Sequence, residues 1–134
     1  MRPHLYLRAY MAGTAMPTVV LPLAVTVFLI GRYETDSTLP VAALVFPMAV
    51  VPTMWGLWNV LHLAIRSRVR IPLGLHGALL PLILMPLVVG LLREVGLFDL
   101  PLGTVAAFAP VGMIGYYLVW KYIVGFCNAE LGIA

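Results

Sequence analysis

Charge is scarce in this sequence of 134 residues. Charged residues make up 10% of the chain and apolar residues 63%, whereas a soluble domain is about 25% charged and about half apolar. A chain this short cannot bury such an apolar excess in one core, because small domains leave much of their surface exposed. The composition therefore excludes an ordinary water-soluble fold and predicts a membrane protein.

Cysteine is almost absent, since Cys127 is the one thiol in the chain. A single cysteine excludes an internal disulfide and a cysteine-based metal cluster. We interpret Cys127 as structural, with palmitoylation of a thiol near the membrane surface as a minor alternative.

Sequence motifs of catalysis are missing as well. The chain has no glycine-rich phosphate loop, no H-E-x-x-H and no G-x-S-x-G, which are the patterns of nucleotide, zinc and acyl-transfer sites. No Asp or Glu falls inside a long apolar run, which argues against paired-carboxylate chemistry and against a carboxylate-coupled proton pathway. We predict no catalytic residues, no metal site and no enzyme activity. A lipid-modifying enzyme is the last alternative, because no nucleophile with an adjacent base is visible.

Long apolar runs are what the sequence does contain. Four of them lie between the charge clusters, approximately at residues 10–30, 39–65, 71–92 and 100–122. Each is near or above the ~20 residues that a helix needs to cross a bilayer core of ~30 Å. Lipid offers no partner to a free backbone group, so these runs must be helical. The sequence predicts one all-α membrane domain over residues 1–134, a four-transmembrane-helix bundle.

The distribution of Lys and Arg predicts the orientation of these helices. Two arginines precede the first run, three lie between the second and third, and Lys121 ends the fourth, whereas the other two connections have one arginine each. Positive flanks stay in the cytoplasm, so we expect both termini on the cytoplasmic side of a bacterial-type inner membrane. A cleaved signal peptide is disfavoured, because no A-x-A-like site follows the first run.

Proline recurs in a regular pattern, as two prolines separated by four apolar residues. The pairs are Pro17 with Pro22, Pro47 with Pro52 and Pro81 with Pro86. Each interior proline removes a backbone hydrogen bond, so we predict proline-bent helices. The bends either fix the packing shape or form a hinge or cavity, as interrupted helices do in transporters. The similar connections "RYETDSTLP" and "REVGLFDLP" suggest two tandem helical hairpins.

Polar residues of the second run form one stripe. Trp55, Trp58, Asn59 and His62 are spaced i, i+3, i+4 and i+7, which places them on one helix face. Asparagine and histidine in lipid should turn towards other helices. The stripe therefore predicts either packing inside the bundle or the lining of a polar pathway.

His62 and His76 should lie at similar depth on neighbouring helices. Two imidazoles in such positions can ligate a b-type haem, share a metal or relay a proton, or they can hydrogen-bond within the bundle. We favour the hydrogen-bonding role and expect no cofactor. A haem-binding membrane anchor using His62 and His76 stays as an alternative.

Arg66, Arg68 and Arg70 lie together between the second and third runs. Such a cluster fixes topology and attracts anionic lipid headgroups. It is too short and too apolar in its flanks to predict nucleic-acid binding.

Small residues are frequent in the fourth run, where they allow close approach of another helix. They pack either within this chain or against a homo-oligomer or partner membrane subunit. They are Gly103, Ala106, Ala107, Ala109, Gly112 and Gly115.

Taken together, these features predict a small integral inner-membrane protein that acts as an interaction or accessory subunit. The alternative from another class is a small oligomeric transporter or channel, lined by the polar stripe of the second helix.

Overall fold

The computed structural model describes residues 4–33, 41–94 and 101–133. These residues are 88% helical and include no strand. The predicted outer connections, residues 34–40 and 95–100, lie outside the described residues. The elements in chain order are α1 (Leu5–Tyr33), α2 (Val41–Ile65), α3 (Leu73–Leu79), α4 (Pro81–Glu94), α5 (Leu102–Val119), a π-helical turn η1 (Trp120–Val124) and α6 (Gly125–Glu130).

Within the described residues, four helical segments are long and apolar enough to cross a membrane, which matches the predicted number of spans. They are Leu5–Phe28, Pro47–Ile65, Leu73–Leu91 and Gly103–Glu130. The first begins earlier than predicted and the fourth ends later, because helical backbone continues past the flanking charges. Lys121 stays inside the fourth segment with its ammonium near the rings of Tyr117 and Tyr122, at 5.7 and 5.1 Å. The last helix ends before Gly132, whose positive φ of 67° suits glycine.

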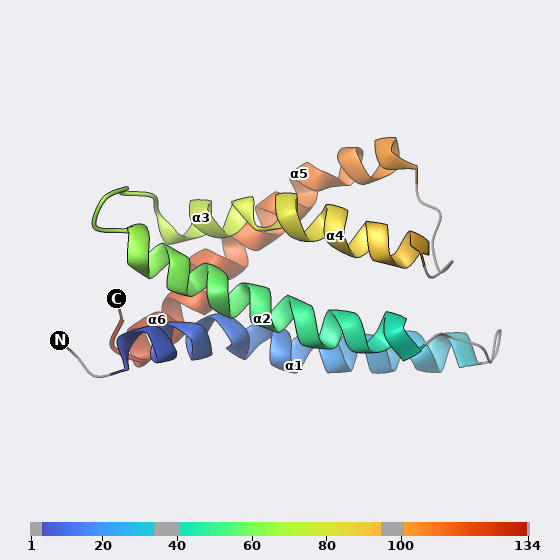
Figure 1. Cartoon of the computed structure of the whole chain (residues 1–134), viewed down its shortest axis with the longest axis horizontal. Helices are drawn as coiled ribbons and strands as arrows, with labels where there is room; N and C mark the ends of the chain where they lie inside the picture. The colour runs from blue at the N-terminus through green and yellow to red at the C-terminus, as the bar shows by residue number, and fades with distance from the viewer. Residues whose placement is uncertain (1–3, 34–40, 95–100, 134) are drawn as a thin grey trace.

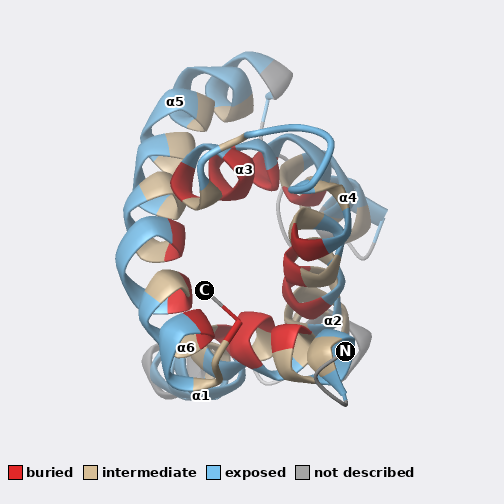
Figure 2. Cartoon of the chain, turned by 90° about the vertical axis from the view of Figure 1, so that its left-hand side faces the viewer, coloured by how far each residue is buried: buried red, intermediate tan, exposed pale blue. Residues whose placement is uncertain are grey.

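The helices enclose an interior that is most closely packed at one end. α1 lies along α2, and α3 packs against α5 and η1 (Figure 1). The start of α1, the end of α6 and the connection of residues 66–72 lie at the same end of the bundle (Figure 1). Seen from that end, the buried residues of α2, α3, α4 and α6 face inward, whereas no described side chain of α5 is buried (Figure 2). One buried cluster is built on Trp55, Leu80, Leu84, Trp120 and Val124, and a second on Ala9, Ala12, Leu63 and Ile133, with half-buried Cys127 packed against it.

Glycines permit the closest helix contacts in this interior. A Cβ on Gly13 would lie 2.6 Å from the Trp55 carbonyl oxygen, and one on Gly56 would lie 2.6 Å from the Tyr10 ring. A Cβ on Gly77 would overlap the Trp120 side chain. Apolar helices associate through small residues of this kind, so these positions set the α1–α2 and α3–η1 contacts.

Proline affects the third long segment most clearly, because the helix breaks at Leu80, between α3 and the first residue of α4, Pro81. α1 and α2 continue through both prolines of their pairs. Pro81 has no N–H to give the Gly77 carbonyl, and the Leu80 N–H donates to that carbonyl instead, at 3.1 Å. The carbonyl of His76, which would accept from Leu80 in a regular helix, is left to another donor.

The outer surface of the bundle is apolar. Among the side chains that the structure describes, seven large apolar ones are more than 60% exposed: Val19, Leu23, Val27, Phe108, Val111, Ile114 and Phe126. These side chains lie on α1, α5 and α6.

Candidate functional site

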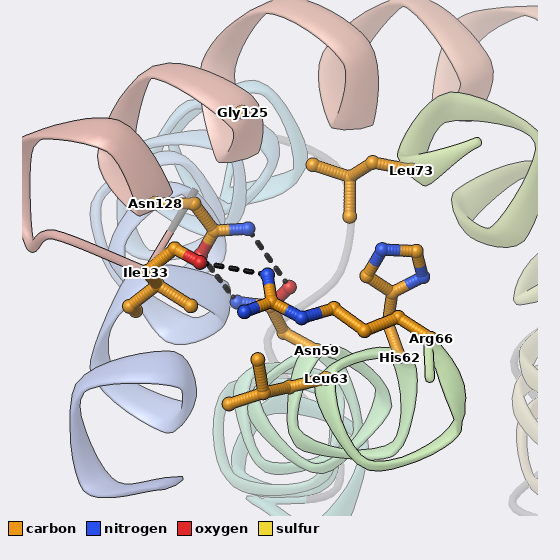
Figure 3. Close-up of a pocket in the computed structure, with 8 residues that line it drawn as sticks. All are labelled: Asn59, His62, Leu63, Arg66, Leu73, Gly125, Asn128 and Ile133. Carbon is orange, nitrogen blue, oxygen red and sulfur yellow. Dashed lines mark hydrogen bonds between the residues drawn. The ribbon is translucent and has the colours of Figure 1, made fainter. Parts of the chain in front are cut away.

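Polar side chains gather at the end of the bundle that holds the described chain ends. The C-terminal half of α2 contributes Asn59 and His62, the connection that follows α2 contributes Arg66, and α6 contributes Asn128. These residues surround one pocket (Figure 3).

Two asparagines form the buried centre of this group. Asn59 is 1% exposed, and its Nδ2 donates to the Ala9 carbonyl and to Asn128 Oδ1, each at 2.8 Å. Asn128 Nδ2 returns a bond to Asn59 Oδ1 at 3.2 Å. The amides therefore connect α1, α2 and α6 and satisfy polar groups that would otherwise be costly to bury.

Trp58 and His76 connect α2 with α3. The Trp58 Nε1–H donates to the His76 carbonyl at 2.9 Å, which is the carbonyl released by the break at Pro81. His76 Nε2 lies 3.0 Å from the Trp58 carbonyl, so this nitrogen carries the proton. The two rings stack with centroids 4.8 Å apart. The proline break and the tryptophan are thus parts of one hydrogen-bonded junction.

This junction predicts a measurable coupling between Trp58 and Pro81. Trp58→Phe should lower the free energy of unfolding by about 1–2 kcal/mol, because the buried His76 carbonyl loses its donor. In a Pro81→Ala background the helix can regain the Leu80 N–H to His76 bond, so the same substitution should cost less. Denaturant unfolding of the four proteins of this cycle measures the difference. Equal costs of Trp58→Phe in both backgrounds would contradict the junction.

The two histidines lie in ring contact. Their centroids are 4.9 Å apart at an angle of 51°, and the Trp58 indole stacks on His76. Axial imidazoles of a haem stand on opposite faces of the porphyrin, and rings in mutual contact leave no room for that plane. His76 Nε2 is also occupied by the Trp58 carbonyl. This arrangement does not fit a haem held between His62 and His76.

The part of the chain that the structure describes has no cluster of metal-ligating side chains. Residues 4–33, 41–94 and 101–133 contain no group of three or more His, Cys, Asp or Glu side chains placed to hold an ion.

The pocket has a volume of about 140 Å³, equivalent to four or five waters at about 30 Å³ each. Arg66 is exposed at its edge and donates from Nη1 to the Ile133 carbonyl at 2.7 Å. The lining residues are Asn59, His62, Leu63, Arg66, Leu73, Gly125, Asn128 and Ile133 (Figure 3).

The predicted stripe on α2 divides among three environments. Asn59 and His62 line the pocket, and Trp58 bonds to α3. Trp55 lies in the aromatic core, with ring centroids 5.0 Å from Tyr116 and 5.6 Å from Trp120.

The predicted arginine cluster divides as well. Arg66 lines the pocket, whereas Arg68 and Arg70 are exposed on the connection to α3 and do not line it. Sequence reasoning missed Asn128 and the Ile133 carbonyl, because the fourth span was predicted to end at residue 122. Asn128 is one of only two asparagines in the chain, and that rarity was the available signal.

A second feature is an apolar crevice along α5, which we call the α5 crevice. Its volume is about 410 Å³, and it lies between α1, α2 and α5. A Cβ on Gly115 would meet nothing within 4 Å, and one on Gly112 would meet only Met85 Cε at 3.7 Å. The lining residues are Met16, Pro17, Val20, Leu21, Val51, Trp55, Gly112, Gly115, Tyr116 and Val119.

The chain matches no family model, no curated protein and no solved structure. The polar pocket and the α5 crevice are therefore the features from which a function can be inferred.

The other small residues of α5 lie outside this crevice. Ala106 and Ala109 line a smaller apolar crevice of about 200 Å³ against α4. Ala107 is exposed, and a Cβ on Gly103 would have no neighbour within 4 Å. Along α5 the small residues thus leave space, in contrast to Gly13, Gly56 and Gly77.

Proposed function

We propose that this chain is a small integral protein of a bacterial-type inner membrane that acts as an accessory subunit. Four apolar helices and an outer surface of exposed Val, Leu, Ile and Phe support the membrane setting. The Lys and Arg distribution supports cytoplasmic termini. In this proposal α1 with α2, and α3 and α4 with α5, form two hairpins.

The observation that carries the accessory role is the open α5 crevice. Gly13, Gly56 and Gly77 are covered by a backbone or an aromatic ring of the same chain. Gly112 and Gly115 are open to an apolar hollow of about 410 Å³. Small residues facing such a hollow permit close packing of another helix, which is the main source of helix association in lipid.

The occupant we propose is a membrane-spanning helix of a different polypeptide. A two-fold homodimer brings the same patch of both copies together, and two concave crevices do not fill each other. A spanning helix presents an apolar, convex surface, which is the shape that would fill the crevice.

The alternative of a small oligomeric transporter would use Trp55, Trp58, Asn59 and His62 as a pathway. Asn59 bonds to Ala9 and Asn128, and the crevices beside α5 are lined by apolar residues. These contacts support packing by the stripe, so we place transport second.

Cross-linking from the crevice tests the accessory role. A photoreactive amino acid at Val111, which is exposed beside Gly112, should capture one defined polypeptide in the native membrane. Gly115→Leu fills the crevice and should reduce that product about tenfold, since one misfitted contact is worth about 1.4 kcal/mol.

Gly90→Leu is the matched control, because a Cβ on Gly90 also meets nothing within 4 Å and Gly90 does not line the crevice. It should leave the cross-link unchanged. Equal loss with both variants, or products with lipid alone, would refute the proposed role.

A further inference from the structure

The pocket beside Arg66 is lined by hydrogen-bonding groups that have no partner among the described residues. A guanidinium has five N–H donors. Arg66 uses one of them, on Nη1, to donate to the Ile133 carbonyl. Asn128 Nδ2 gives one bond to Asn59 and has a second N–H. His62 Nδ1 is buried, and within residues 4–33, 41–94 and 101–133 it has no hydrogen-bond partner.

The charge of the pocket lining favours an anion. Arg66 supplies a permanent positive charge, and none of the eight lining residues is acidic. A cation would therefore meet repulsion and no carboxylate ligand. Arg68 and Arg70 on the neighbouring connection add positive potential near the same end.

The size of the pocket limits the kind of anion. Its volume of about 140 Å³ is below the ~300–1,000 Å³ typical of sites for drug-sized ligands. It has room for one small tetrahedral or planar group with a few waters. The planar fork of arginine matches phosphate oxygens and can bind two of them at once.

We propose that this pocket binds a phosphate group, with Arg66 as the charged donor and His62 and Asn128 as further donors. The phosphate belongs to an anionic lipid headgroup or to a small soluble phosphate. Leu63 and Leu73 in the lining provide apolar contact beside the anion. The pocket shares no lining residue with the α5 crevice. An experiment can therefore refute the phosphate site without refuting the accessory role, and the reverse.

Titration of the purified, delipidated full chain tests this site. Native mass spectrometry with short-chain phosphatidylglycerol measures the lipid arm, and calorimetry with inorganic phosphate measures the soluble arm. Binding in the lipid arm alone assigns the site to a headgroup, and binding in the phosphate arm assigns it to soluble phosphate. Absence of binding in both arms overturns the proposal.

Matched variants separate a built site from general surface charge. Arg66→Gln should weaken binding about tenfold or more, because a charge-assisted pair of bonds is lost. Arg68→Gln makes the same change of charge outside the pocket and should stay within about twofold of the parent. Equal losses of binding in the two variants would mean that diffuse electrostatic attraction, and not the pocket, holds the phosphate.

A third variant avoids disturbing the Arg66 bond to Ile133. A Cβ on Gly125 would make only ordinary contacts, at 3.6 Å from the Trp120 carbonyl oxygen and 3.7 Å from Leu73 Cδ2. Gly125→Leu should therefore fold, fill the pocket and abolish phosphate binding. Unchanged binding in a folded Gly125→Leu protein would overturn the proposal.

Discussion

Replacing Gly77 by alanine should destabilise the bundle by about 3 kcal/mol or more, the largest effect expected of a single added methyl group. The new Cβ would overlap the Cβ, Cγ and Cδ1 atoms of Trp120. Trp120 is fully buried and packs against Trp55 at 5.6 Å between ring centroids. Because its Cβ is fixed to the η1 backbone, the indole cannot withdraw without moving that turn away from α3.

Gly90→Ala provides the control for this substitution. Gly90 lies inside α4, and a Cβ there would meet nothing within 4 Å. Alanine should be neutral or stabilise by about 0.5–1 kcal/mol, because glycine is the weaker helix former. Unfolding in detergent followed by circular dichroism measures both variants. A Gly77→Ala protein as stable as Gly90→Ala would show that α3 does not lie against Trp120.

Replacing Asn59 by leucine should cost about 2–4 kcal/mol of unfolding free energy. Leucine has a similar volume, so the loss comes from hydrogen bonding and not from a cavity. Asn128 would keep a buried amide without its partner, and the contact between α2 and the Ala9 carbonyl of α1 would disappear. Each orphaned buried group costs about 1–3 kcal/mol.

The double variant Asn59→Leu with Asn128→Leu tests the reason for that loss. Removing both amides leaves no unpaired side chain, so the double variant should be at least as stable as Asn59→Leu alone. Additive losses would mean that the two amides act separately and would contradict the reciprocal pair.

Much of the helix plan could be predicted from the sequence. The four apolar runs correspond to the four long apolar segments of the structure. The stripe on α2 was placed on one face by the period of the helix alone, and Asn59 and Trp58 bond to other helices. Charged residues mark the flanks of an apolar run, but they do not end the hydrogen-bonded helix. The fourth span therefore continues to Glu130.

The contacts between helices could not be predicted. A helix that is apolar on every side has no preferred face, so the sequence gives little indication of which neighbour each one meets. The glycines illustrate this limit, since Gly77 fits against Trp120 and Gly115 faces open space. Local sequence does not distinguish the two. The partner of Asn59 was likewise hidden, because Asn128 lies 69 residues away.

The break at Pro81 shows that the effect of a proline depends on the tertiary structure around it. The prolines of the third apolar run predict the loss of a backbone hydrogen bond. The structure adds that the Trp58 Nε1–H from α2 satisfies the released His76 carbonyl. A bend was foreseeable from the sequence, whereas the donor that makes it tolerable depends on the packing of α2 against α3.

The most direct test of the accessory role is a native mass spectrum of the protein extracted gently from its own membrane. We expect the 14.6 kDa chain in complex with a different polypeptide, and loss of that complex in Gly115→Leu but not in Gly90→Leu. The chain alone, or only integer multiples of its own mass, would contradict it.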